Sequence, residues 1–335
     1  MRILLYAAVD LSLPGGLEAH VLGLAAALHS RGHQVDLFGK PASLPPYSMV
    51  DSVDPSKYDV LHHHGGLWPQ ALAACPKVVR TFHFCVPAKM EVYVRRGRLR
   101  TLANLANWRA SADERASVQH AAALVAVSDR LCGEIARWHG VPRSRITHVP
   151  NAITRTPGVA PCDEWRARHG IDPSAPVLLT IGRRDFVKGL DLLDRAWRIA
   201  RPANAIWVQV GGAPSPKQTD RLGTGPLPPD QVAAWIAAAD VGAFPSYYEG
   251  GGIALLEMLA GGLHTFSHEV GCAREVIHPG RNGALVAPNV NAWASELRRL
   301  LHAVPARHDD GPGHEYEWPA IAERLEQIYT RVAAQ

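Results

Sequence analysis

The sequence is poor in cysteine and contains no long apolar run. Its five cysteines are an odd number and lie far apart, which excludes the density of a disulfide scaffold and the paired spacing of a zinc site. No segment reaches the ~18 apolar residues that a membrane-spanning helix requires, and the first apolar run ends too early for a signal peptide. We therefore expect a cytoplasmic chain that is at most peripheral to a membrane.

Strong charge and the common nucleotide motifs are missing as well. A formal net charge of +4 over 335 residues gives no general reason to bind nucleic acid, and none is expected as a partner. The chain has neither the G-x-G-x-x-G fingerprint of dinucleotide-binding domains nor the G-x-x-x-x-G-K-[ST] phosphate loop. Any anion site must therefore use other loops.

What the sequence does contain is a regular alternation of strand and helix patterns, typical of α/β domains with parallel sheets. Its 335 residues, 47% of them hydrophobic, provide for two cores, and the Pro-rich segment 152–176 has the composition of a linker. We predict two doubly wound domains, 1–155 and 156–317, with ligands at the carboxyl ends of the strands and in a cleft between the domains. Strand patterns occupy residues 3–9, 34–38, 60–63, 78–83, 124–127, 177–181, 205–210, 241–245 and 262–266.

Two glutamates flank a glycine loop in Glu249-Gly-Gly-Gly-Ile-Ala-Leu-Leu-Glu257, between a predicted strand and a predicted helix. Consecutive glycines do not favour a helix, because each costs about 1 kcal/mol there. They allow the backbone at Gly251, Gly252 and Ile253 to approach an anion at the helix N-terminus, with Glu257 about two turns further on. The alternative is a solvent-exposed turn with a capping glutamate.

A second loop, Gly182-Arg-Arg-Asp-Phe-Val-Lys-Gly189, follows the strand pattern at 177–181. Arg183 and Lys188 bracket this loop, so both can point into the crevice at the end of the strand. Two cations there suit a diphosphate, whose charge must be neutralised if it is to become a leaving group. A basic strand-end loop can also be plain surface, but the nearby glycine loop favours an anion site.

Gly15 and Gly16 lie in the loop after the first predicted strand, in Leu-Pro-Gly-Gly-Leu-Glu-Ala-His20. Without a Cβ, they let the backbone come close to a ligand from the first domain. An ordinary turn between a strand and a helix explains them equally well.

The chain resembles the retaining glycosyltransferase family 4 in six motifs that follow the family order. These motifs are Gly-Gly-x-Glu-x-His ending at His20, Val-Pro-Asn at 149–151, Gly-Arg-x5-Gly with Lys188, Ala-Asp-Val-x3-Pro-Ser before Glu249, the E-x7-E pair, and Glu275 in Gly-Cys-Ala-Arg-Glu. The resemblance implies a GT-B architecture, with the acceptor mainly on the first domain and the donor mainly on the second. It also implies that a C-terminal helix, residues 318–335, crosses back onto the first domain.

The resemblance further implies a nucleotide-sugar donor, in the first place a UDP-sugar, which is a substrate rather than a cofactor. Arg183 and Lys188 would hold the donor diphosphate, with the Gly16 backbone closing over it. Glu257 would bind the ribose hydroxyls, and Glu249 would contact hydroxyls of the transferred sugar. The implied transfer is a front-side reaction in which the departing diphosphate helps to take the acceptor proton.

His83 ends a strand pattern in Arg-Thr-Phe-His and resembles the family histidine that faces the reacting sugar. Strand ends are where such sites lie, although most of the 17 histidines must be surface or core residues. The run His62-His63-His64 also ends a strand, and alternate side chains there cannot all face one site. We expect His64, together with His20, on the acceptor side.

No metal or other cofactor is expected. The chain lacks Asp-x-Asp, the motif by which the other main glycosyltransferase fold holds a divalent cation on the donor phosphates. No carboxylate or cysteine lies at a recognisable ligand spacing from the histidine run. Arg183 and Lys188 are the cations available for the same task.

Two departures from the family leave the donor's base and sugar open. Segment 213–226 is shorter than the family's run, which contains an extra helix and strand and usually frames the nucleobase. Gly251 stands where the family most often has an aromatic residue, which loosens the loop beside the donor sugar.

Segment 80–110 contains seven Lys or Arg residues and one acidic residue, with Trp108 near its end. Its densest part consists of Arg95, Arg96, Arg98 and Arg100. A solvent-exposed helix face accounts for such a pattern. The alternatives are contact with a phosphate-bearing acceptor or with an anionic membrane surface.

The main prediction is a hexosyltransferase-type enzyme that acts on an unidentified acceptor. Among related GT-B proteins, a nucleotide-sugar epimerase would need carboxylates on both sides of the sugar, and a phosphorylase would need a phosphate site in place of an acceptor pocket. A non-catalytic nucleotide-sugar-binding subunit is the third alternative. The intact set of Arg183, Lys188, Glu249 and Glu257 argues against it.

Overall fold

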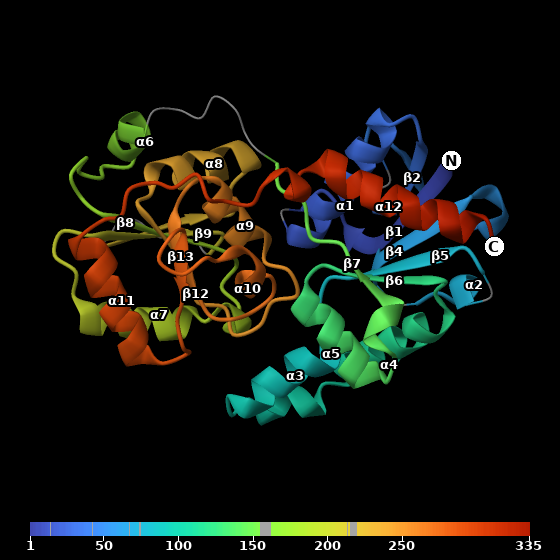
Figure 1. Cartoon of the computed structure of the whole chain (residues 1–335), viewed down its shortest axis with the longest axis horizontal. Helices are drawn as coiled ribbons and strands as arrows, with labels where there is room; N and C mark the ends of the chain where they lie inside the picture. Colours follow the sequence, from blue (N-terminus) through green and yellow to red (C-terminus); the bar gives the residue numbers. More distant parts are fainter. Residues whose placement is uncertain are drawn as a thin grey trace. The chain divides into compact units, whose positions relative to one another are not determined.

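The chain forms two units, each built around one parallel sheet (Figure 1). The computed structural model describes residues 1–13, 15–41, 43–66, 68–73, 75–154, 162–212, 214 and 220–335. Unit 1 comprises Met1–Ala152 and His314–Gln335, and unit 2 comprises Ile153–Gly313. The expected domain boundary between residues 155 and 156 lies outside the described residues.

The sheet of unit 1 has seven parallel strands in the order β3-β2-β1-β4-β5-β6-β7. The chain runs from β1 outward through β2 to β3 and then returns to β4 on the other side of β1. The carboxyl ends of β1 and β4 therefore form a topological switch point, where doubly wound sheets bind ligands. The strands are β1 (Arg2–Asp10), β2 (Gln34–Lys40), β3 (Ser48–Val50), β4 (Val60–Gly65), β5 (Val78–Phe82), β6 (Ala123–Ala126) and β7 (Ile146–His148).

Helices connect and cover these strands, as the sequence pattern predicts. Helix α5 begins at Asp129, because the Ser128 hydroxyl caps it by accepting a hydrogen bond from the Leu131 N–H at 3.1 Å. The helices of unit 1 are α1 (Gly16–Ser30), α2 (Gln70–Ala73), α3 (Val86–Arg95), α4 (Leu105–His120), α5 (Asp129–His139) and α12 (Trp318–Ala333), with short 3₁₀ turns η1 (Pro55–Lys57), η2 (Leu99–Ala103), η3 (Arg143–Arg145) and η5 (His314–Tyr316).

The sheet of unit 2 has six parallel strands in the order β10-β9-β8-β11-β12-β13. Its switch point lies between β8 and β11, because the chain leaves β8 toward one edge and returns beside it as β11. The strands are β8 (Val177–Ile181), β9 (Ile206–Val210), β10 (Arg221–Gly225), β11 (Val241–Phe244), β12 (His264–Ser267) and β13 (Gly283–Leu285). The helices are α6 (Cys162–Arg168), α7 (Leu190–Ala200), α8 (Pro229–Ala238), α9 (Ile253–Ala260), α10 (Ala273–Val276) and α11 (Val290–His302), and the turn η4 is Phe186–Lys188.

One expectation about unit 2 is wrong. Segment 213–226 is expected to lack the extra strand of the family, yet β10 forms within it and pairs in parallel with β9, with Arg221 opposite Trp207. Its glycines and polar residues do not form the apolar pattern of a strand. They are tolerated because an edge strand pairs with only one neighbour and buries few side chains.

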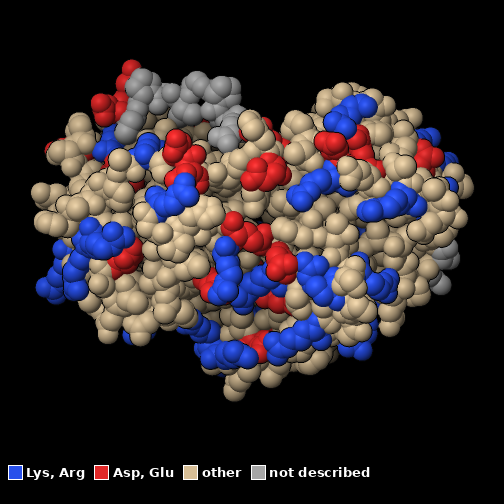
Figure 2. Space-filling view, in the orientation of Figure 1, with Lys and Arg blue, Asp and Glu red and all other residues tan. Residues whose placement is uncertain are grey.

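The surface carries charges of both signs. Lys and Arg side chains are interspersed with Asp and Glu over most of the face in Figure 2, in keeping with the small net charge. Of the helices that the structure describes, none is long and apolar enough to cross a membrane.

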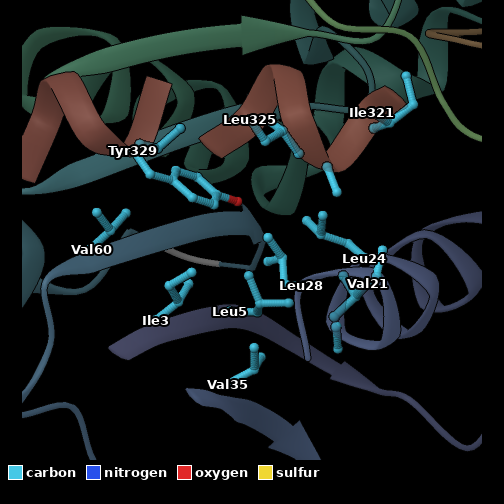
Figure 3. Packing of buried hydrophobic residues seen from close by; sticks show 14 of the residues in the cluster. Ile3, Leu5, Val21, Leu24, Leu28, Val35, Val60, Ile321, Leu325 and Tyr329 are labelled. Atoms are coloured by element: carbon cyan, nitrogen blue, oxygen red, sulfur yellow. The ribbon is translucent and has the colours of Figure 1, made fainter. Parts of the chain in front are cut away.

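The core of unit 1 is closed by the last helix of the chain. In α12, Ile321, Leu325 and Ile328 are buried, and their spacing puts them on one apolar face of the helix. Figure 3 shows Ile321 and Leu325 of α12 beside residues of β1 and α1, and α12 packs alongside α1. The residues of the C-terminus are therefore part of the first unit's core.

We expect Leu325→Ala to lower the free energy of unfolding of unit 1 by about 2–5 kcal/mol, because a fully buried leucine leaves a cavity when it is truncated. Leu325 is 1% exposed. The measurement is urea unfolding followed by fluorescence. Glu323→Ala, on the exposed side of the same helix, is the control and should change the midpoint little. Equal effects of the two variants would contradict the packing described.

Candidate functional site

Two charged side chains meet at the carboxyl edge of the unit 2 sheet, in the loops that follow β8 and β11. Lys188 Nζ donates to Glu249 Oε1 at 2.6 Å, and Ser246 Oγ donates to the same oxygen at 2.9 Å. The side chains of Lys188 and Glu249 are 27% and 15% exposed. Because solvent is largely displaced, their attraction exceeds that of a surface pair. The pair sits at the switch point of the sheet.

The two loops are fixed against each other by backbone contacts. The Tyr247 N–H donates to the Val187 carbonyl at 2.7 Å. Gly189, with φ 65°, lies so close to the Pro245 carbonyl that an added Cβ would stand 1.9 Å from its oxygen. Only glycine fits there. The positions of Lys188 and Glu249 are thus set by the backbone as well as by their own ion pair.

Helix α9 begins four residues after Glu249, and no side chain caps its N-terminus. Gly252 is its N-cap, with φ 106°, and the first turn contains no acidic residue. The first N–H groups of a helix have no partner within it and attract anions. Gly251, Gly252 and Ile253 are thus placed as the sequence predicted, beside Glu249.

Arg183 extends the positive character of this edge. It follows β8 directly and is exposed, and the described residues provide no ion pair or hydrogen bond for its guanidinium. The stem of Lys188 lies over the neighbouring Gly182, its Cδ and Cε 3.6 Å from where a Cβ would be. One cation is therefore paired with Glu249, while the other faces solvent.

Glu257 lies nearer the start of α9 than expected. The helix begins at Ile253, so Glu257 is just over one turn inside it and not two. The residue as a whole is half-buried, and the burial of its carboxylate raises the pKa of that group to about 7. The described residues provide no hydrogen-bond partner for the carboxylate, so it is available to a ligand.

Three histidines converge at the carboxyl edge of the unit 1 sheet. His64 Nδ1 lies 3.2 Å from His83 Nε2, and the His20 ring lies 5.3 Å from that of His64 and 4.7 Å from that of His83. The structure thus brings together all three histidines that the sequence predicted for this unit. Neither ring nitrogen of His20, nor Nε2 of His64, has a hydrogen-bond partner in the described part of the chain.

The other two histidines of β4, His62 and His63, contact different residues. His62 is held by Tyr329, whose hydroxyl lies 2.6 Å from Nδ1, and by Thr81, whose hydroxyl lies 2.7 Å from Nε2. His63 stacks on Tyr6 with ring centroids 4.8 Å apart, on the other face of the sheet, as the alternation of a strand requires. His64 is therefore the member of the run that faces His20 and His83.

Burial keeps the three converging rings neutral. It lowers the pKa of His20 to about 4, where the Asn151 side chain opposes the shift slightly. It also lowers the pKa of His64 and of His83 well below the usual value, and neighbouring histidines add to the effect. At neutral pH these rings can donate or accept hydrogen bonds without carrying charge.

Gly15 and Gly16 stand at the start of α1, but this N-terminus is not vacant. Gly15 is the N-cap, and the carboxylate of Glu18 lies against it: Oε2 is 2.0 Å from where a Cβ of Gly15 would be. A carboxylate in the first turn already satisfies part of the helix dipole. An incoming phosphate would have to displace the Glu18 side chain.

Two groups of potential metal ligands occur among the described residues. In one, both oxygens of Glu114 accept a hydrogen bond from the Val86 N–H, at 3.0 and 2.9 Å, and Oε2 lies 3.3 Å from His139 Nε2. That carboxylate therefore anchors the start of α3. The other group is His20, His64 and His83, whose ligand atoms lie within 4.8 Å of one another; imidazoles without a carboxylate suit a transition metal rather than Mg²⁺.

Sequence reasoning missed several side chains of these two regions. Ser246, in the Pro-Ser that precedes Glu249, holds the carboxylate in place. The indole of Trp318, from the start of α12, lies 5.5 Å from the His20 ring. The strand-end position of Ser246 is a signal that could have found it, whereas nothing local to Trp318 indicates its contact with α1.

Comparison with known proteins places both units in one family. The family description "Glycosyltransferase Family 4" matches residues 47–156, and "Glycosyl transferases group 1" matches residues 175–303. The chain belongs to glycosyltransferase family 4. It is accordingly a glycosyltransferase of the GT-B fold.

Several curated relatives that align with this chain are named D-inositol 3-phosphate glycosyltransferase. The one from Streptosporangium roseum is 27% identical over 396 residues, covering 96% of this chain and 89% of that protein. One from Catenulispora acidiphila is 30% identical over 243 residues, covering 62% of this chain and 56% of that protein. This chain therefore covers most of the first relative but little more than half of the second.

Solved structures agree on the fold. Sucrose-phosphate synthase from Thermosynechococcus elongatus matches with a TM-score of 0.78 at 19% identity, covering 99% of both chains. Anabaena HepE, solved with UDP and glucose, matches with a TM-score of 0.69 at 16% identity, covering 100% of this chain and 98% of that one. At such identities the likeness establishes architecture alone.

The raised pKa of Glu257 gives a stability prediction. Because the folded pKa, about 7, lies above that of a solvated glutamate, about 4.3, this group favours the folded state at low pH and loses that contribution as pH rises toward 7. Relative to Glu257→Gln, the glycosyltransferase should therefore lose up to about 3 kcal/mol of unfolding free energy between pH 4.5 and 7.5. Urea unfolding across that range measures the difference. A Glu164→Gln control, at an exposed glutamate, should show none; a pH-independent difference for Glu257→Gln would contradict its burial.

Proposed function

We propose that this glycosyltransferase transfers a sugar from a nucleotide-sugar, in the first place a UDP-sugar, to an acceptor hydroxyl with retention of the anomeric configuration and without a metal ion. The observation that carries the proposal is the Lys188–Glu249 pair, 2.6 Å apart, close in the chain to the N-terminus of α9, which no side chain caps. An ammonium group, a carboxylate and the N–H groups of a helix N-terminus thus lie in the loops at the switch point between β8 and β11. This set matches the parts of a nucleotide-sugar: a diphosphate, a sugar and a ribose.

The diphosphate would bind to Lys188, to Arg183 and to the N–H groups at Gly251, Gly252 and Ile253. Arg183 is the exposed cation at the end of β8, and an arginine can bind two phosphate oxygens at once. A helix N-terminus supports the same negative charge through its dipole. These groups would be most useful as the diphosphate departs and its charge grows.

The two carboxylates suit hydroxyl groups. Lys188 and Ser246 both approach Oε1 of Glu249, whereas Oε2 has no hydrogen-bond partner among the described residues. This second oxygen can accept from a hydroxyl of the transferred sugar. Glu257, without a described partner and with a pKa of about 7, would accept from the ribose hydroxyls when ionised.

His83 is proposed to contact the reacting sugar, with His20 and His64 on the acceptor side and Gly15 and Gly16 near the donor phosphates. Neutral imidazoles suit hydroxyl groups because they can both donate and accept. The names of the relatives make inositol phosphates the first acceptors to test. The expected chemistry is front-side: the bond from C1 to the diphosphate oxygen breaks, the acceptor oxygen bonds C1 on the same face, and its proton passes to the departing diphosphate.

Donor binding is tested by thermal stabilisation with a panel of nucleotide-sugars and the nucleoside diphosphates. A ligand at 100 times its dissociation constant adds about 2.7 kcal/mol of stability, so the right donor should raise the melting temperature clearly. Lys188→Ala should raise the donor's dissociation constant about tenfold or more, because a charged hydrogen bond contributes about 1.5–3 kcal/mol. Arg195→Ala, an exposed arginine of α7, is the control. Unchanged donor binding by Lys188→Ala would contradict the assignment.

Turnover should not depend on a divalent cation, since Arg183, Lys188 and the α9 N-terminus are proposed to balance the diphosphate charge. We expect EDTA to leave the rate of product formation unchanged, measured by mass spectrometry of the glycosylated acceptor, which also separates transfer from epimerisation. Loss of activity in EDTA that is restored by added Mg²⁺ or Mn²⁺ would rule out this mechanism. The anomeric configuration of the product, read by NMR, tests retention in the same assay.

A further inference from the structure

The segment from Arg95 to Arg109 in unit 1 exposes large apolar side chains in unusual density. It runs from the end of α3 through η2 into the first turns of α4. Half of the large apolar side chains found exposed in the described part of the chain lie within ten of its residues, at 44% to 73% exposure. They are Leu99, Leu102, Leu105 and Trp108. Burying them in a partner would remove a substantial apolar area from water.

The same segment carries charge of one sign. It contains five exposed arginines and no aspartate or glutamate. Lys and Arg side chains gather over α3 at the lower edge of the view in Figure 2. The arginines are Arg95, Arg96, Arg98, Arg100 and Arg109. Arg95 also contacts Glu91 on its own helix at 2.5 Å.

An ordered backbone presents these side chains. The Asn104 side chain caps α4 by accepting from the Ala106 N–H at 3.0 Å, and Asn107 Nδ2 donates to the Thr101 carbonyl at 3.1 Å. The Trp108 indole N–H donates to the Leu102 carbonyl at 2.7 Å. Since its polar group is already satisfied, the Trp108 ring can leave water without losing a hydrogen bond.

We propose that the segment 95–109 docks unit 1 on an anionic membrane surface. Arginines there would meet lipid phosphates, and leucine and tryptophan side chains would enter the boundary between headgroups and acyl chains. A soluble polyanion would engage the arginines but leave four apolar side chains in water. A purely apolar protein groove would gain nothing from five like charges. The mixture of both in fifteen residues fits a lipid surface best, and the inference does not depend on the donor proposed above.

Vesicle sedimentation of the full chain tests this inference. Vesicles of phosphatidylcholine alone are compared with vesicles of phosphatidylcholine and phosphatidylglycerol. We expect roughly tenfold or greater binding to the anionic vesicles, weakened by added salt. Equal binding to both kinds of vesicle, or none to either, would overturn the proposal.

Variants separate the two kinds of contact. Arg98→Glu/Arg100→Glu should reduce binding to anionic vesicles about tenfold or more, whereas Arg195→Glu/Arg331→Glu, at exposed arginines elsewhere, should not. Leu105→Ser/Trp108→Ser should reduce binding even at high salt, with Ile199→Ser as the apolar control. Circular dichroism melting and donor-induced stabilisation check that each variant is folded and still binds donor. If charge reversal leaves binding intact, or the apolar variants bind as the parent does, the surface is not a membrane site.

Discussion

The contact between Lys188 and Glu249 is the interaction on which the arrangement at the carboxyl edge of the unit 2 sheet depends. An ammonium group withdrawn from water needs a counterion, and Glu249 provides it at 2.6 Å. The pair in turn requires the loops after β8 and β11 to lie together, which the Tyr247–Val187 hydrogen bond and the close approach of Gly189 to Pro245 ensure. Lys188 and Ser246 both donate to Oε1 of Glu249, and the residues that the structure describes provide no partner for Oε2. Helix α9 begins four residues after Glu249. Ion pair, loop packing and helix N-terminus therefore form one arrangement.

Parallel strand order explains why residues far apart in the sequence come together in each unit. In unit 2 the switch point joins the loop after β8 to the loop after β11, which is the third strand after β8 along the chain. In unit 1 the same rule brings the β1 loop and the end of β4 together, so that His20 and His64 become neighbours, and β5 adds His83. The two sheets share a topology and differ in chemistry: one edge gathers charges, the other neutral imidazoles.

Much of this fold could be predicted because its signals are local. Alternating strand and helix patterns, the Ser128 cap and the apolar face of α12 all depend on residues close in sequence. The hydrogen bond from Ser246, the contact of Trp318 with His20 and the pKa of Glu257 depend on packing between distant segments, which no local pattern encodes. Strand β10 was missed for a related reason: it is stabilised by its neighbour β9 and not by its own apolar residues.

The N-termini of α1 and α9 both follow glycines, but they differ in whether an acidic side chain lies in the first turn. At α1 the Glu18 carboxylate lies against Gly15, so a phosphate there must first displace a side chain of like charge. At α9 no acidic residue stands in the first turn, and Glu249, four residues before the helix, is paired with Lys188. An anion can therefore approach α9 without rearranging the helix, while Lys188 must divide its hydrogen bonds between the anion and Glu249. A ligand hydroxyl that donates a hydrogen bond to Glu249 would replace the part of the Lys188 hydrogen bond that the carboxylate loses to the anion. This reasoning favours a ligand that carries both an anion and a hydroxyl group over a bare phosphate.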